Sequence, residues 1–179
     1  MDLPPESSPK AAADTDPSFG AQRSEHENLR RLFVGENYPY YARNWRRMEE
    51  EKRQPFWNWA AFFLGVGWMG YRKMYRYAAI FTAIILIELI LEYVFKLEAG
   101  FRQVVNIANA VVVGNQANRW YLGHVETKLR ELAAPAGEID YQQLARAGGT
   151  SVGTGFGVFG AVMVAAMLVV LILASLGTH

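Results

Sequence analysis

The sequence contains no cysteine, and this absence excludes several kinds of chemistry. A chain without cysteine forms no disulfide, offers no thiolate nucleophile and cannot hold an iron–sulfur cluster or a cysteine-based zinc site. Histidine is also scarce, and the positions of His26, His124 and His179 give no pair with the spacing of a metal site. The sequence therefore predicts no metal site and no bound cofactor.

An excess of charge of one sign is missing as well. The net charge is +1 at pH 7 over 179 residues, so the whole chain has no general attraction to nucleic acid or to an acidic partner. Charged residues are unevenly placed: they recur up to Arg53 and are absent after Arg146. The average composition of the chain resembles that of a soluble protein, but its first part is polar and its last part is apolar.

Recognisable catalytic motifs are absent too. The closest match is Gly155-Phe-Gly157-Val-Phe-Gly160, which has the G-x-G-x-x-G spacing of a dinucleotide-binding turn. That turn requires a preceding strand and an acidic residue about 20 positions later, and no acidic residue follows here. We therefore expect neither nucleotide binding nor enzymatic activity.

The first two segments are polar. Residues 1–28 have few large apolar side chains and four prolines, which predicts a disordered tail. Asp2 and Glu6 stand where a signal peptide carries basic residues, so we expect this tail to stay in the cytoplasm. Residues 29–54 mix aromatic and basic side chains, as at a membrane surface or in a groove for single-stranded nucleic acid. Without an RNA-binding signature, the membrane surface is favoured.

Uncharged apolar runs follow. Residues 54–71 are barely long enough to cross a bilayer and contain three glycines, which fits a re-entrant hairpin or a short tilted helix beginning at Pro55. Residues 77–95 and residues 151–176 are each long and apolar enough to be a transmembrane helix. Residues 101–121 are also long enough, but they are polar and could lie at the interface instead.

Together these segments predict an all-α integral membrane protein with a disordered tail, a shallow first apolar element and three transmembrane helices. Its predicted parts are a tail (1–28), a basic aromatic segment (29–54), a membrane core (55–128), a polar cytoplasmic connection (129–150) and a C-terminal transmembrane helix (151–179). We expect separate short helices at 125–133, across the start of the connection, and at 138–146, within it.

Lysine and arginine mark the cytoplasmic side of membrane proteins. If the first apolar run returns to the side from which it entered, every basic cluster lies inside, including the predicted membrane-surface cluster Arg72, Lys73 and Arg76. The sequence therefore predicts a multi-pass protein with its N-terminus in the cytoplasm and its C-terminus outside.

Glu88 lies past the midplane of the second apolar helix, where ionised side chains are costly and often functional. It is either a proton or ion site or a polar contact between helices. Asn106 and Asn109 are the nearest amides able to satisfy it, while Glu92 is expected to pair with Lys96 four residues on.

A stripe of small residues, Gly153, Gly157, Ala161 and Ala165, recurs every four positions in the last helix. Such a stripe allows the close approach of a neighbouring helix, either from the same chain or from a second copy.

Several motifs resemble one family. They are Phe33-Val34-Gly35, Phe56-Trp57-Asn58-Trp59-Ala60-Ala61-Phe62-Phe63, Tyr71-Arg72-Lys73-Met74-Tyr75, Gly114-Asn115 and Asn118-Arg119-Trp120-Tyr121 through His124. The chain resembles, over residues 32–128, the bacterial membrane family called "domain of unknown function 2628". The resemblance implies a small multi-span protein of the bacterial inner membrane and carries no assigned activity.

The leading functional hypothesis is a non-enzymatic membrane protein that acts through protein or lipid interactions, as a small subunit or assembly factor. Its expected partners are the lipid bilayer and either another membrane protein or further copies of itself, and no nucleic acid is expected. The alternative is an oligomeric channel or transporter component in which Glu88 and the face carrying Asn106 and Asn109 form a polar pathway.

Overall fold

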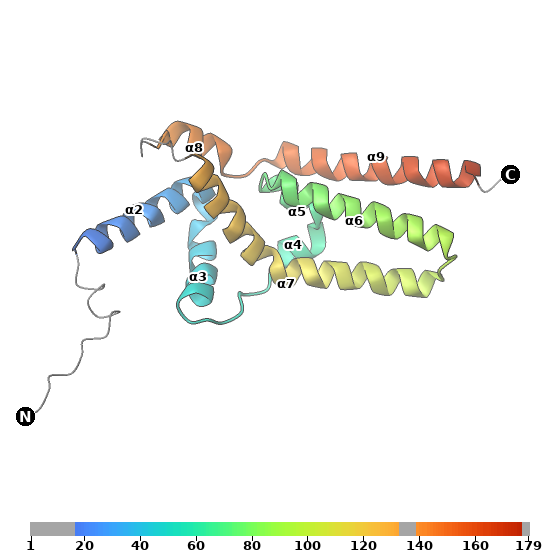
Figure 1. Ribbon diagram of the computed structural model, residues 1–179, viewed down its shortest axis with the longest axis horizontal. Coiled ribbons are helices and arrows are strands. Elements are labelled where there is room, and N and C mark those ends of the chain that lie inside the picture. The colour runs from blue at the N-terminus through green and yellow to red at the C-terminus, as the bar shows by residue number, and fades with distance from the viewer. Residues whose placement is uncertain (1–16, 133–138, 177–179) are drawn as a thin grey trace, which may run out of the picture.

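The computed structural model describes residues 17–132 and 139–176, and these residues form helices and no strand. In chain order the elements are α2 (Pro17–Val34), the 3-10 helix η1 (Gly35–Asn37), α3 (Tyr38–Glu49), α4 (Trp59–Leu64), α5 (Val66–Tyr71), α6 (Tyr75–Val94), α7 (Ala99–Leu132), α8 (Tyr141–Ala147) and α9 (Val152–Leu176). The molecule is elongated: α6, α9 and the first half of α7 extend to one end, and α2, α3 and α8 lie at the other (Figure 1).

The beginning of the chain differs from the prediction. Helix α2 begins at Pro17, so residues 17–28 are helical and the predicted tail is wrong for them. Residues 1–16 of the predicted tail lie outside the described residues. The helix is stabilised by tertiary contacts that local composition does not reveal, because Leu29, Phe33 and Val34 at its end are buried in the core.

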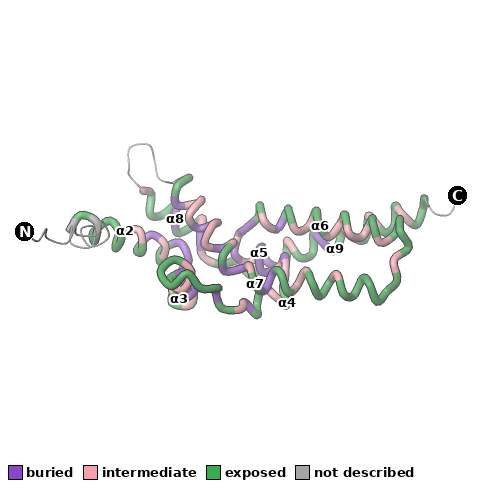
Figure 2. Tube along the Cα trace, turned by 60° about the horizontal axis from the view of Figure 1, so that its bottom comes forward, coloured by how far each residue is buried: buried purple, intermediate pink, exposed green. Residues whose placement is uncertain are grey.

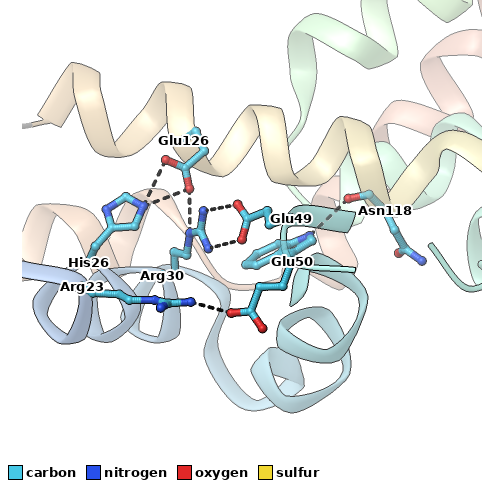
Figure 3. Close-up of polar contacts among 8 residues, drawn as sticks. Arg23, His26, Arg30, Glu49, Glu50, Asn118 and Glu126 are labelled. Carbon is cyan, nitrogen blue, oxygen red and sulfur yellow. Dashed lines mark hydrogen bonds and ion pairs between the residues drawn. The ribbon is translucent and has the colours of Figure 1, made fainter. Parts of the chain in front are cut away.

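Those contacts include a cluster of ion pairs that fastens α2 to its neighbours (Figure 3). Arg30 donates from Nε to Glu126 of α7 at 2.7 Å and from Nη2 to Glu49 of α3 at 2.7 Å. Its side chain is 16% exposed, and the guanidinium lies over the ring of Trp45. A shielded arginine shared by two carboxylates holds three helices together more firmly than an exposed pair would.

The first apolar run folds as two short helices rather than one. The predicted helix start at Pro55 is wrong: α4 begins at Trp59, and the Asn58 side chain caps it by accepting from the backbone N–H of Ala61 at 3.0 Å. Gly65, at φ +50, ends α4 and starts α5. Because each helix has six residues and spans about 9 Å, neither crosses a bilayer, and the alternative of one tilted helix is also wrong.

Two of the described helices, α6 and α9, are long and apolar enough to cross a membrane by length and composition. The sequence predicted three. The third, residues 101–121, is the first half of α7, which is not apolar enough because asparagine and glutamine interrupt it. The predicted break before residue 125 is also wrong, since α7 continues without interruption from Ala99 to Leu132.

The core lies where the two ends of the molecule meet. Its largest fully buried side chains are Trp45, Tyr121, Phe33, Met69 and Met74. On α7 a buried stripe recurs every four residues, at Val113, Ala117, Tyr121, Val125 and Leu129. Figure 2 shows burial concentrated at this junction, whereas α6, α9 and the first half of α7 are mainly exposed beyond it.

Helix α9 packs against α5 through glycines other than the predicted stripe. A Cβ on Gly70 would lie 2.7 Å from Val158 Cβ, and a Cβ on Gly155 would lie 3.2 Å from Tyr71 Cβ. By contrast, a Cβ on Gly153 or Gly157 would meet nothing within 4 Å. Ala161 is exposed and Ala165 partly exposed, so the predicted stripe is not the packing face within this chain.

Candidate functional site

Three buried asparagines join separate parts of the chain at the junction. Asn44 is on α3, Asn58 caps α4 and Asn118 is on α7, and none of them is more than 4% exposed. Asn58 Nδ2 donates to Asn118 Oδ1 at 2.9 Å, and Asn118 Nδ2 lies 3.2 Å from Asn44 Oδ1. We call these residues the asparagine cluster.

The asparagine cluster also satisfies the backbone of the irregular segment between α3 and α4. Asn118 Nδ2 donates to the carbonyl of Phe56 at 2.8 Å, and the N–H of Phe56 donates to Asn44 Oδ1 at 2.7 Å. The N–H of Asn58 donates to the carbonyl of Gly114 at 2.9 Å. Buried backbone groups outside regular structure need such partners, so the cluster fixes the position at which α4 begins.

Arg72, at the C-cap of α5, is the second unusual feature of the junction. It is 4% exposed, although arginine is rarely buried without a charged partner. Its guanidinium carbon lies 4.7 Å from the ring centre of Tyr41 and 5.2 Å from that of Tyr121. These distances are typical of cation–π contacts, which stabilise a desolvated cation.

The compensation of Arg72 is incomplete. Its Nε and Nη1 atoms are buried, and the polar groups beside its guanidinium include the hydroxyls of Tyr41 and Tyr121, which carry no charge. Among the described residues no carboxylate forms an ion pair with Arg72. Burial raises the pKa of Tyr41, with the charge of Arg72 acting in the opposite direction, so Tyr41 is neutral and supplies no counter-charge.

An open groove of about 440 Å³ borders this cation. Tyr41, Tyr71 and Arg72 belong to its wall, and Trp59, Ala60 and Leu64 of α4 line it on the exposed side. Arg72 is the one charged residue among its lining residues in the described part of the chain. The groove thus combines one buried cation with aromatic and apolar surface.

The three residues of the predicted basic cluster, Arg72, Lys73 and Arg76, have three different environments in the structure. Arg72 is buried, which makes its prediction as a surface residue wrong. Lys73 Nζ donates to the carbonyls of Arg146 and Gly148 at 2.8 and 2.6 Å, so it fastens the end of α8. Of the three, only Arg76 is exposed.

His124 lies three residues after Tyr121 on α7. It is 8% exposed, its ring stacks on Tyr121, and its Nε2 atom has no hydrogen-bond partner. A pocket of about 420 Å³ beside it is also lined by Lys73, Arg76 and Lys128. Burial lowers the pKa of His124 to about 4, and the charge of Lys128 adds to this effect while Glu131 opposes it.

This low pKa predicts a loss of stability in mild acid. As the pH falls below about 6.5, the unfolded chain protonates His124 while the folded chain keeps it neutral down to about 4. The free energy of unfolding should therefore fall by up to about 3 kcal/mol across this range and change no further below it. Thermal unfolding of wild type and His124→Gln between pH 7.5 and pH 4 isolates the contribution. Parallel curves for the two proteins would contradict the prediction.

The predicted intramembrane site is partly assembled. Asn109 Nδ2 donates to the two carboxylate oxygens of Glu88 at 3.0 and 2.8 Å, as the sequence suggested. Asn106 is exposed and does not join them. Glu92 lies 3.8 Å from Arg102, not beside Lys96 as predicted, because the chain turns at Lys96 with φ +51.

No residue of the asparagine cluster was predicted as a site residue. The sequence did offer one signal, since Asn58 and Asn118 stand in two of the family-like motifs. Polarity alone was misleading, because the same α7 stretch contains three other asparagines, Asn106, Asn109 and Asn115, from which composition does not distinguish Asn118. In the part of the chain that the structure describes, no three His, Asp or Glu residues gather to hold a metal ion.

Comparison with known proteins gives one match. The model of a family described as "Protein of unknown function (DUF2628)" matches residues 21–126, more than half of the chain. No curated protein and no solved structure matches. The matched region contains the asparagine cluster, Arg72 and His124, and it ends before α8 and α9. The resemblance seen in the motifs is thereby confirmed, and the chain belongs to the DUF2628 family.

Proposed function

We propose that this protein is a small, non-enzymatic protein of the bacterial inner membrane that acts through lipid or protein interactions at the cytoplasmic surface. In this proposal α6, α9 and the first half of α7 cross the bilayer, α4 and α5 form a shallow re-entrant element, and α2, α3 and α8 lie in the cytoplasm. The partner is the bilayer, together with a membrane protein or further copies of this chain.

The exposed apolar surface of α6 and α9 carries the proposal. Within the most apolar part of each helix, 6% of the residues are buried. Ile87 and Val94 on α6 and Met167, Leu171 and Leu176 on α9 are each more than half exposed. Two neighbouring helices with so much apolar surface would be unstable in water, whereas hydrocarbon covers such surface without cost.

The first half of α7 supports a third span on different grounds. Residues 99–118 would be about 30 Å long as a helix, and they run beside α6 toward the junction (Figure 1). Their polarity is partly satisfied internally, because Asn109 bonds to Glu88 of α6. At the junction end Trp120 packs on Tyr77 and Phe81, as aromatic residues do at a membrane interface.

The absence of cysteine allows a direct test of this topology. Single cysteines would replace Gln54, Glu98 and Glu131 and be labelled in intact cells with a maleimide that cannot cross the membrane. We expect labelling at position 98 alone, because 98 lies in the turn between α6 and α7, whereas 54 lies between α3 and α4 and 131 lies in the last turn of α7, both on the proposed cytoplasmic side. Carbonate washing should leave the protein in the membrane. Release by carbonate would contradict the membrane assignment, and labelling at 131 would contradict the three-span arrangement.

Substitutions of Glu88, which bonds to Asn109, separate a structural role from the channel or transporter alternative. If the contact is structural, Glu88→Gln retains an acceptor and should change stability little, whereas Glu88→Leu should cost about 1–2 kcal/mol by leaving Asn109 unpaired. Thermal unfolding in detergent measures both variants.

A proton-carrying role for Glu88 would give a different pattern. Glu88→Gln would fold normally because it keeps a hydrogen-bond acceptor. It would abolish the growth or flux phenotype as completely as Glu88→Leu, because an amide cannot take up and release a proton as a carboxylate does. A normally folded Gln variant with normal function would exclude this role and leave the structural contact.

A further inference from the structure

We infer that the groove beside Arg72 binds the anionic headgroup of a membrane amphiphile, with the phosphate against the guanidinium and the acyl chain along the exposed side of α4. The inference rests on the proposed membrane location and names the chemistry of one interaction made there.

The first argument is the missing counter-charge. Burying a cation is costly unless an opposite charge or hydrogen bonds compensate it. Arg72 is 4% exposed, and it is contacted by the ring faces and the neutral hydroxyls of Tyr41 and Tyr121, whereas no carboxylate among the described residues pairs with it. An anion in the bordering groove would supply the compensation that the described residues do not. Arginine suits phosphate because its planar fork of donors matches the phosphate oxygens.

The second argument is the character of the groove itself. Away from Arg72 its lining is mainly aromatic and apolar, with two asparagines, Asn37 and Asn58, and it contains no second cation among the described residues. Trp59 is 63% exposed and Leu64 is 56% exposed, so the apolar surface continues out of the groove along α4. A free inorganic anion would gain nothing from this surface, whereas an amphiphile with one anionic head and an apolar chain would use both parts.

The third argument is position. Arg72 ends α5 and lies three residues before the start of α6, the helix that is apolar enough to cross a bilayer. In the proposed topology this point lies at the depth of lipid headgroups on the cytoplasmic side. Basic pockets between helices at that depth are typical sites for anionic lipids.

The pocket beside His124 is the competing location. It contains more positive charge, from Lys73, Arg76 and Lys128. Two of these charges are already engaged: Lys73 donates to two carbonyls, and Lys128 pairs with Glu131 at 2.6 Å. The test below therefore includes a variant that would reveal anion binding in the pocket beside His124 instead.

The experiment titrates the full chain, purified in an uncharged detergent, with three probes by calorimetry. The probes are dioctanoyl phosphatidic acid, dioctanoylglycerol with the same chains and no phosphate, and inorganic phosphate. We expect phosphatidic acid to bind at least tenfold more tightly than either of the others, since the loss of a charge-assisted contact or of the apolar surface each costs about a factor of ten or more. Arg72→Gln should lower its affinity by at least tenfold, and Arg72→Lys by less.

A blocking variant keeps the test valid if Arg72→Gln does not fold. Ala60 is exposed and lines the groove, so Ala60→Trp fills the groove without disturbing the core and should also lower the affinity at least tenfold. Ala83→Trp is the matched control, since Ala83 is exposed on α6 and lines no part of the groove. It should bind like wild type.

Four results would overturn the inference. They are unchanged binding by a folded Arg72→Gln, unchanged binding by Ala60→Trp, equal binding of phosphate and phosphatidic acid, and a loss of binding in Arg76→Gln with Lys128→Gln but not in Arg72→Gln. The last result would place the anion beside His124. Because binding is measured in detergent, a failure to bind phosphatidic acid would contradict the inferred site without contradicting membrane insertion, which the labelling and carbonate experiments test.

Discussion

Replacing Asn118 with leucine is expected to lower the free energy of unfolding by about 3–5 kcal/mol. Leucine has a similar size, so the change removes hydrogen bonds with little change in packing volume. Asn118 donates to the Phe56 carbonyl, lies beside Asn44 Oδ1 and accepts from Asn58, in a position that is fully buried. The Phe56 carbonyl and the Asn58 amide would lose this partner, whereas Asn44 Oδ1 keeps its bond from the N–H of Phe56. An unsatisfied buried polar group costs about 1–3 kcal/mol.

Asn115→Leu is the control for this prediction. Asn115 lies on the same helix three residues earlier and is exposed, so its replacement should change stability by less than about 0.5 kcal/mol. Thermal unfolding in detergent, followed by helical circular dichroism, compares the two variants. Limited proteolysis should also cleave Asn118→Leu between α3 and α4, because the asparagine cluster holds that segment in place. Similar melting temperatures for Asn118→Leu and Asn115→Leu would contradict the importance of the cluster.

The parts of the fold that the sequence predicted are those set by local pattern. Helices α6 and α9 lie within two residues of the predicted apolar runs, because a run of about 20 apolar residues is read from composition alone. The short polar helix predicted at 138–146 is found as α8, Tyr141–Ala147, with Asp140 as its N-cap and Gly148 as its C-cap. Family membership was found from contiguous motifs, which also need no knowledge of distant contacts.

The candidate site could not be predicted because distant parts of the chain assemble it. Asn58 and Asn118 are 60 residues apart, and Arg72 is buried by Tyr41 and Tyr121 from two other helices. In the sequence, Arg72 is simply the first of three basic residues between apolar runs, and such residues are usually solvated. Nothing local distinguishes it from the exposed Arg76, four positions later.

The stripe on α9 is not the face that packs within this chain, for a related reason. Helical spacing defines which residues share a face, but it does not determine which face meets a neighbour. Glycines occur on more than one face of the first turns of α9, and the rotation of the helix is set by α5. Gly155 faces Tyr71 and the carbonyl of Gly67, whereas Gly157 faces open space.

This rotation makes Gly70→Leu the second substitution with a large expected effect. A Cβ on Gly70 would lie 2.7 Å from Val158 Cβ and 2.9 Å from the carbonyl oxygen of Thr154, closer than atoms approach without displacement. That carbonyl belongs to the α9 backbone, so the helix itself would have to move. The hydrogen bond from the Thr154 hydroxyl to the Gly70 carbonyl, now 2.9 Å, would be lost with it. We expect a destabilisation of about 3 kcal/mol, the upper part of the range for overpacked contacts.

Gly157→Leu adds the same side chain to α9 on a face with nothing within 4 Å of the added Cβ, and it should leave the unfolding temperature in detergent nearly unchanged. The pair therefore separates the contact that the fold uses from the stripe that the sequence suggested. The same comparison tests a second copy of the chain as the neighbour. If Gly157→Leu were the more damaging of the two, and cross-linking of the wild type in membranes gave a dimer that this variant lost, the exposed stripe would be an interface between copies. If only Gly70→Leu is destabilised and cross-linking is the same in both, the close helix contact of this protein is the one between α5 and α9.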